Sequence, residues 1–139
     1  MNMRKLTLFV SALALSAVIT VRVQAQGGSV KVNVPFPFVV AKMSLPAGEY
    51  ILTNSDHKVL ISKGKAESVA MVLANPVMGR KNPKRGQVIF QCYGRQCFLS
   101  EVWAPSHDVG GQILHSRTEI GVARHESPTY FALMGDTAK

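Results

Sequence analysis

The sequence predicts an all-β protein, a single-domain antiparallel β-sandwich or small barrel of about six to eight short strands. Three observations favour this class. Residues 29–34 alternate strictly between polar and apolar side chains, which is the period of a strand with one buried face. Turn-forming Gly, Pro, Asn and Asp residues recur at short intervals, and no helical period separates the expected strands.

The expected strands follow one another with little between them. Pro35 and Pro37 come directly after the first strand, and because each removes a backbone N–H donor, residues 35–40 should form an edge or a bend. Turns are expected at residues 45–49, 54–57 and 63–65, and strands at residues 29–34, 50–53, 59–62, 69–73, 87–93 and 97–103.

One helical signal interrupts the β pattern near the C-terminus. Residues 116–119 read Ser-Arg-Thr-Glu, a capping box that predicts one short C-terminal helix. Gly121 opposes this helix by about 1 kcal/mol relative to Ala, and residues 112–117 are the alternative seventh strand. Residues 129–134 are expected either to pair as a last strand or to fray, and the tail from about residue 135 to be disordered.

The segment 88–100 predicts a hairpin with a disulfide. A two-residue type II′ turn at residues 94–95 places Gly first, as that turn requires. Cys92 then lies opposite Cys97 at a non-hydrogen-bonded position, where Cα atoms approach to ~4.5 Å, within the range for a disulfide. Because CxxC spacing is absent, we interpret the bridge as a structural link rather than a redox pair.

The first 25 residues have the layout of a secretory signal peptide. Arg4 and Lys5 give a positive start, residues 6–21 form an uncharged apolar run, and small residues precede Gln26. The run has 16 residues, fewer than the ~20 of a membrane-spanning helix, so we expect cleavage before Gln26 rather than an anchor.

The remaining part, residues 26–139, is expected to be one β domain in a periplasmic or secreted location, with no transmembrane segment. Its net charge is +5 rather than the +8 of the full chain, because three basic residues lie in the leader. That charge suits solubility and a weak attraction to anionic surfaces, whereas export argues against nucleic acid as a partner. Two cysteines in an exported protein favour one bridge.

Several short motifs occur in a fixed order along this part. They are VNVPFPFVV at residues 32–40, LPAGEY at 45–50, YG at 93–94, FLSEVW at 98–103 and SR at 116–117. The set resembles a group of small exported hypothetical proteins of bacteria, common in acidobacteria, and the resemblance extends to about Arg124. It implies a bacterial origin and an envelope or secreted location, and it brings no activity, cofactor or catalytic residue.

The clearest polar feature is a basic segment within a predicted 13-residue connection over residues 74–86. Connections of this length are uncommon unless they are functional or disordered. Arg80, Lys81, Lys84 and Arg85 are candidate ligands for an anionic polymer, such as envelope phosphate or an acidic glycan. No aromatic residue separates them, so stacking on bases is not indicated. The competing interpretation is a solvated loop of like charges.

No constellation typical of catalysis or metal binding appears in the sequence. The four histidines, His57, His107, His115 and His125, lack the spacing of zinc ligands. No Gly-x-Ser-x-Gly motif occurs, and nothing in the spacing of the acids selects a glycosidase pair. The sequence therefore predicts no catalytic residue, no metal site and no cofactor.

Glu101 is the one acid inside a strongly apolar strand. In the hairpin register above it opposes Val88, and an inward-facing carboxylate is costly without a partner. We expect a structural ion pair with Arg117. Trp103 shares the face of Glu101 by parity and is expected in the core.

These observations favour a non-catalytic binding or structural module of the bacterial cell envelope. One alternative is an anion- or polysaccharide-binding module that uses the basic residues 80–85. The other is a small extracytoplasmic hydrolase built from loop residues, which would require a histidine to meet a serine or a carboxylate in a pocket.

Overall fold

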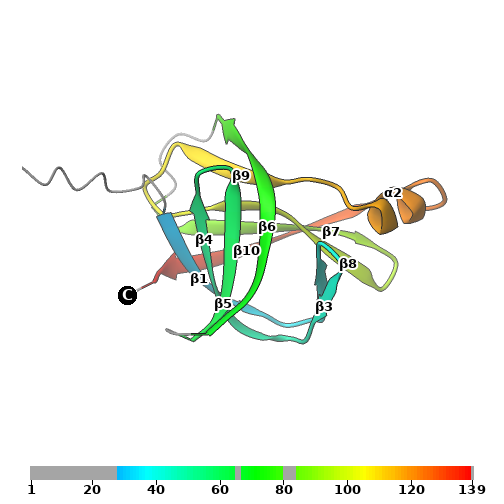
Figure 1. Ribbon diagram of the computed structural model, residues 1–139, viewed down its shortest axis with the longest axis horizontal. Coiled ribbons are helices and arrows are strands. Elements are labelled where there is room, and N and C mark those ends of the chain that lie inside the picture. The colour runs from blue at the N-terminus through cyan, green and yellow to red at the C-terminus, as the bar shows by residue number, and fades with distance from the viewer. Residues whose placement is uncertain (1–27, 65–66, 80–83, 139) are drawn as a thin grey trace, which may run out of the picture.

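The computed structural model describes residues 28–64, 67–79 and 84–138, and the predicted signal peptide lies outside these ranges. The described chain forms ten strands and one short helix (Figure 1). In chain order the elements are β1 (Gly28–Val34), β2 (Phe38–Val40), β3 (Met43–Leu45), β4 (Gly48–Ser55), β5 (Lys58–Lys63), β6 (Glu67–Met78), β7 (Gly86–Tyr93), β8 (Gln96–Trp103), β9 (Val109–Ile113), α2 (Arg117–Ala123) and β10 (Thr129–Thr137).

The strands form one sheet that closes on itself. Its order is β3-β2-β8-β7-β10-β1-β4-β5-β6-β9, and β8 also pairs with β9. The eight strands from β8 through to β9 are joined by antiparallel pairings only, so they make a closed barrel. The predicted all-β class is confirmed in its barrel form. The β2–β3 hairpin lies outside this ring, and β2 runs parallel to β8 at Val39 and Phe98.

Inward-facing side chains of the ring strands, together with Phe38 of β2, form the core. Phe38 packs edge to face on Tyr50 and on Phe90, with ring centroids 5.2 and 5.3 Å apart. Burial of each such side chain contributes roughly 1.5–3 kcal/mol. The exposed ion pair between Lys31 and Glu49, with 3.1 Å between Nζ and Oε1, contributes about 0–1 kcal/mol. The apolar interior therefore stabilises the barrel far more than its surface charges do.

Two glycines allow the barrel to close. Gly86 of β7 faces Gly135 of β10, and Val30 of β1 lies against both. A Cβ atom on Gly86 would lie 2.5 Å from Cγ2 of Val30, and one on Gly135 would lie 2.4 Å from it. Side chains cannot pack that closely, so the approach of β1 to β10 requires glycine at both positions.

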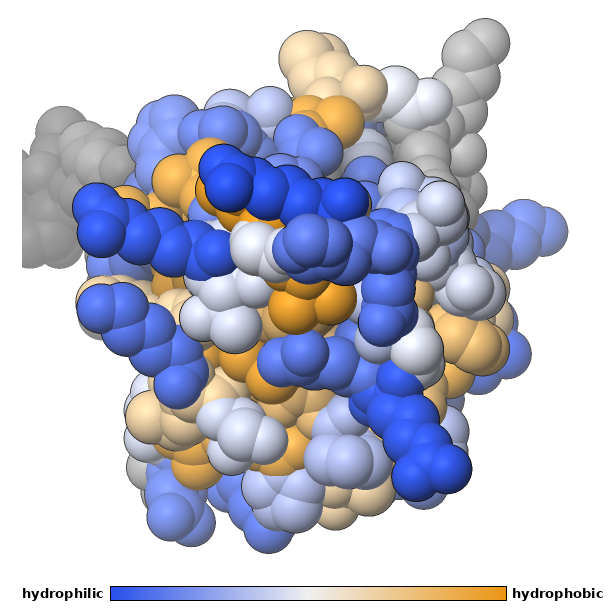
Figure 2. All heavy atoms as spheres, turned by 90° about the vertical axis from the view of Figure 1, so that its right-hand side faces the viewer, coloured by the Kyte–Doolittle hydropathy of each residue, from blue (hydrophilic) through white to orange (hydrophobic). Residues whose placement is uncertain are grey.

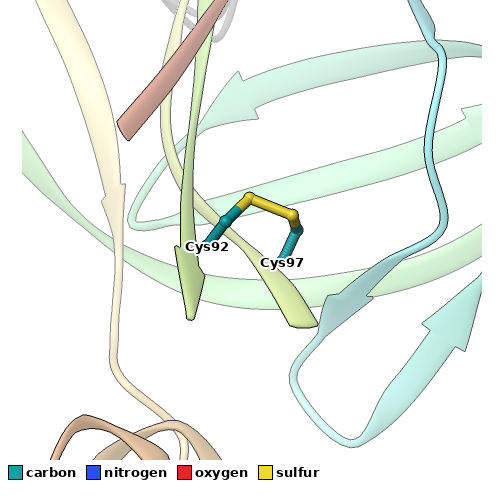
Figure 3. The surroundings of a disulfide bond; sticks show 2 residues. All are labelled: Cys92 and Cys97. Carbon is teal, nitrogen blue, oxygen red and sulfur yellow. A yellow bond between two sulfur atoms is a disulfide. The ribbon is translucent and has the colours of Figure 1, made fainter. Parts of the chain in front are cut away.

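The β7–β8 hairpin has the predicted turn and the predicted pairing at its tip. Gly94 has a φ of 62°, as the first position of a type II′ turn requires. Cys92 lies opposite Cys97, and the two form a disulfide with Cα atoms 4.0 Å apart (Figure 3). Both cysteines belong to the buried core, so the bridge links neighbouring strands from inside the barrel.

A bulge corrects the predicted register farther along this hairpin. Ile89 lies opposite Glu101, and Val88 lies opposite Val102, whereas the uninterrupted register predicted Ser100 and Glu101 at these places. Ser100 is the additional residue in β8, and one additional residue moves the following side chains to the opposite face. Val102 consequently joins the core and Glu101 does not.

Strand β6 corrects the predicted long connection. β6 continues to Met78 and pairs with β9 through residues 74–78, so the first five residues assigned to the connection belong to a strand, and Gly86 begins β7. Pro76 lies within this strand. Proline is tolerated at this position because β5 pairs only with residues 67–73 of β6. No described strand on that side therefore requires the backbone N–H that Pro76 lacks.

The C-terminal region also differs in part from its predictions. The helix α2 begins after residue 116, and the strand in this region is β9, which ends at Ile113, rather than residues 112–117. The expectation of a disordered tail from about residue 135 is wrong, since β10 continues to Thr137. Its last residues pair with β1, at Lys31 and Val30, and these backbone contacts order them.

Candidate functional site

Helix α2 lies beside the barrel at the end where the β7–β8 hairpin turns and β10 begins (Figure 1). Its start is set by Ser116, whose side-chain oxygen accepts a hydrogen bond of 3.1 Å from the backbone N–H of Glu119. This is the predicted N-cap contact. The Glu119 side chain approaches His115, at 3.0 Å, instead of completing the capping box.

A pocket of about 410 Å³ lies between α2 and the outer face of the barrel wall. Its size falls within the range of small-molecule sites. The pocket is lined by Gln91, Tyr93, His115, Glu119, Ile120, Ala123, Arg124, Pro128 and Tyr130. Figure 2 views the molecule from this end, where hydrophilic side chains surround smaller hydrophobic areas.

Glu119 is the most unusual residue of this pocket. Its side chain is only 5% exposed, and its Oε1 atom accepts no hydrogen bond from any described group. Nδ1 of His115 lies 3.0 Å from that oxygen, but no ring N–H is directed at it well enough to form a hydrogen bond. Because burying a carboxylate without a donor is costly, Oε1 is an acceptor that a bound molecule can satisfy once the Glu119 side chain turns toward it.

Two tyrosines on neighbouring strands form the barrel side of the pocket. Tyr93 of β7 is buried, and its hydroxyl donates to Oε1 of Gln91 at 3.3 Å. Burial raises the pKa of Tyr93, and the Glu119 carboxylate and Tyr130 raise it further. Tyr130 of β10 lies opposite Gln91 of β7 and is 62% exposed. On the helix side, Ile120 is 47% exposed. The lining thus offers apolar surface near one buried carboxylate.

A second concavity, of about 710 Å³, lies between β1, β4 and β10. Its charged groups already have partners. Lys31 pairs with Glu49, and Asp136 pairs with Arg85. This larger hollow therefore contains no buried polar group that needs a ligand among the described residues, and we consider the α2 pocket the candidate site.

The structure describes half of the predicted basic site. Arg80 and Lys81 lie outside the described residues. Lys84 and Arg85 are exposed, and Nη2 of Arg85 lies 3.2 Å from Oδ1 of Asp136. Such a pair contributes little stability. The charge of Asp136 nevertheless offsets that of Arg85, one of the two described residues of the basic segment.

The structure corrects the expected pairing of Glu101 with Arg117. Oε2 of Glu101 accepts a hydrogen bond of 2.8 Å from Nε1 of Trp103, and Arg117 is the first residue of α2. No ion pair joins Glu101 to Arg117 in the described part of the chain. Glu101 and Trp103 share one face of β8, and the bulge at Ser100 turns this face away from the core cluster.

The described residues do not assemble a recognisable catalytic group. No group of three or more His, Cys, Asp or Glu residues among them is arranged to hold a metal ion. Ser116 is engaged in the helix cap, and Nδ1 of His107 lies 2.8 Å from the carbonyl oxygen of Pro105. Within the described ranges, no serine hydroxyl is hydrogen-bonded to a histidine.

Sequence reasoning missed this pocket, although it found the helix. The capping box at residues 116–119 was the available signal, since it positions α2 and places a glutamate at its first turn. The folding of α2 against Tyr93 and Tyr130, which are far away in sequence, had no local signal.

The helix of the described residues is too short to cross a membrane. The chain matches no protein-family model, and comparison with curated proteins and with solved structures finds no significant match.

Proposed function

We propose that this protein is an exported, non-catalytic binding module of the bacterial envelope and that the α2 pocket is its binding site. The observation that carries the proposal is the buried Oε1 atom of Glu119, which accepts no hydrogen bond within an otherwise largely apolar lining. A site of this kind gains stability when a ligand supplies the donor.

Export is supported by two features. The first 25 residues have the layout of a signal peptide, and the disulfide between Cys92 and Cys97 is typical of proteins in oxidising compartments. The resemblance to small exported bacterial proteins agrees with an envelope or secreted location.

Binding is favoured over hydrolysis because the pocket contains a carboxylate and a histidine but no serine or cysteine among its lining residues. Binding at the α2 pocket is favoured over the basic segment because Arg85 is already paired with Asp136. The anion-binding alternative makes a different prediction, which is tested separately below.

The test is a fragment screen by ligand-observed NMR on the protein purified from the periplasm of an expression host. An Ala123→Trp variant fills the pocket from an exposed helix position, and Met71→Trp, at a 61% exposed position on β6, is the matched control. We expect fragments that bind the unaltered protein and the control but not Ala123→Trp. Equal binding to all three proteins would refute the assignment of the site.

A further inference from the structure

We infer that the α2 pocket selects organic ammonium compounds, namely primary amines attached to a compact apolar body. This inference rests on the proposed function and names the ligand class of the same site. Three features of the pocket lead to it, and they concern the charge of the ligand, its body and its fit.

The charge follows from Glu119. Its carboxylate is nine-tenths buried, and Oε1 lacks a hydrogen-bond donor among the described residues. A neutral donor would satisfy the oxygen, but only a cation also compensates a buried negative charge. An ammonium group supplies both, with three N–H donors around one positive centre. A carboxylate or phosphate ligand would be repelled at this position.

The apolar body follows from the walls. The rings of Tyr93 and Tyr130 lie on the barrel side, and Ile120 and Ala123 lie on the helix side. Apolar ligand atoms gain free energy by covering such surfaces. Tyr130 is 62% exposed, and aromatic faces attract cations.

Two basic side chains near the pocket bear on the selectivity. His115 lies 3.0 Å from Oε1 without a hydrogen bond, so a better-directed donor must displace its imidazole from the buried oxygen. Arg124 also lines the pocket, but it is exposed, and solvent and salt screen its charge more strongly than they screen charges in the buried part. Neither side chain supplies the missing donor.

The experiment is a calorimetric titration of the exported protein with three probes that share a phenyl ring. They are 2-phenylethylamine, 2-phenylethanol and 3-phenylpropanoate, which carry a cationic, a neutral and an anionic end. We expect the amine to bind about tenfold more tightly than the alcohol, the factor for one charged hydrogen bond, and the carboxylate to bind least. The isosteric Glu119→Gln variant should abolish the preference for the amine.

The possible outcomes distinguish a wrong ligand class from a wrong binding site. If all three probes bind the unaltered protein equally and Ala123→Trp blocks them, the pocket is a binding site but the inference of an ammonium ligand is overturned. If Glu119→Gln keeps the preference for the amine, Glu119 is not its acceptor and the inference again fails. If neither the probes nor the screened fragments bind in an Ala123-dependent way, the proposed function fails as well. The series in the unaltered protein needs no variant, so it decides the ligand class even if Glu119→Gln does not fold.

Discussion

Nε1 of Trp103 donates a hydrogen bond of 2.8 Å to Oε2 of Glu101, two residues earlier in the same strand. The two residues share one face of β8, and the bulge at Ser100 turns that face away from the core cluster, where an uninterrupted strand would have placed Glu101. A carboxylate in a strongly apolar strand thus becomes the partner of a buried indole.

We expect Glu101→Ala to lower the free energy of unfolding by about 1–2 kcal/mol, since it removes a hydrogen bond to a charged acceptor. Glu101→Gln keeps a side-chain oxygen as acceptor and should cost less. Urea denaturation measures both. Arg117→Ala is the control and should change the stability by less than about 0.5 kcal/mol, as an exposed surface position does. If Arg117→Ala lowered the stability as much as Glu101→Ala does, the result would support the ion pair between Glu101 and Arg117 that the sequence predicted.

Two glycine-to-alanine changes should have opposite effects. Gly135→Ala places a Cβ atom 2.4 Å from Cγ2 of Val30 and 2.7 Å from the carbonyl oxygen of Lys31, so β1 must move, at a cost of about 1–3 kcal/mol. Gly121→Ala in α2 meets no atom within 4 Å and should add about 0.5–1 kcal/mol of stability. Thermal denaturation of the two variants compares them, and a neutral Gly135→Ala would contradict the close approach of β1.

The stability should fall at alkaline pH through Tyr50. Its hydroxyl donates to the carbonyl oxygen of Pro46 at 2.6 Å, and burial raises its pKa. A raised pKa means that the folded state holds the proton more tightly than the unfolded state. The stability that the protonated Tyr50 hydroxyl contributes is therefore fully present below the ordinary tyrosine pKa of about 10. It is lost as the pH rises through the higher pKa of Tyr50 in the folded protein.

Tyr50→Phe should cost about 1 kcal/mol at neutral pH, because the hydrogen bond is lost, but should reduce the decline above pH ~10. The measurement is the urea midpoint from neutral to alkaline pH in both proteins, which cancels the titration of the lysines they share. Since burial also raises the pKa of Tyr93, part of the decline should remain in the variant. Parallel curves for the two proteins would show that Tyr50 does not contribute.

The disulfide should stabilise the fold only modestly. Cys92 and Cys97 are five residues apart, so their bridge constrains a small loop of the unfolded chain. We expect the Cys92→Ser, Cys97→Ser double variant to lose less than the ~3 kcal/mol of a 15-residue loop. Chemical denaturation of the variant beside the reduced native protein measures this. A complete failure to fold would mean that the bridge is required rather than supporting.

The basic segment is tested by charge reversal. We expect a variant with Arg80, Lys81, Lys84 and Arg85 changed to Glu to co-sediment with bacterial envelopes as the unaltered protein does at physiological salt, and Ala123→Trp to lose this association. Loss on charge reversal, together with loss of the native association in high salt, would instead identify these residues as an anion-binding site.

The barrel was predictable from the sequence where local signals were complete. The alternation in residues 29–34 and the Gly94 turn specified β1 and the hairpin tip, including the disulfide pairing. The bulge at Ser100 was not predictable, because an additional residue in a strand has no local signature in an apolar run. The extension of β6 through Pro76 depends on where β5 ends, which is a property of the assembled sheet.

The candidate site was less predictable than the fold. The capping box located α2, but the pocket also needs Tyr93 and Tyr130, which β7 and β10 bring together by non-local pairing. The burial of Glu119 arises only when the helix packs against that wall. Of the four basic residues that sequence reasoning selected, Lys84 and Arg85 are described, and they stand out by charge alone, which indicates exposure rather than a built site.

The most direct measurement is the amide chemical-shift change of the exported protein, followed by NMR, on titration with 2-phenylethylamine. The account predicts that the largest changes occur at Tyr93, Glu119, Ala123 and Tyr130, around the α2 pocket. Changes centred instead on Lys31, Ile51 and Met134, in the second concavity, or no changes at all, would contradict it.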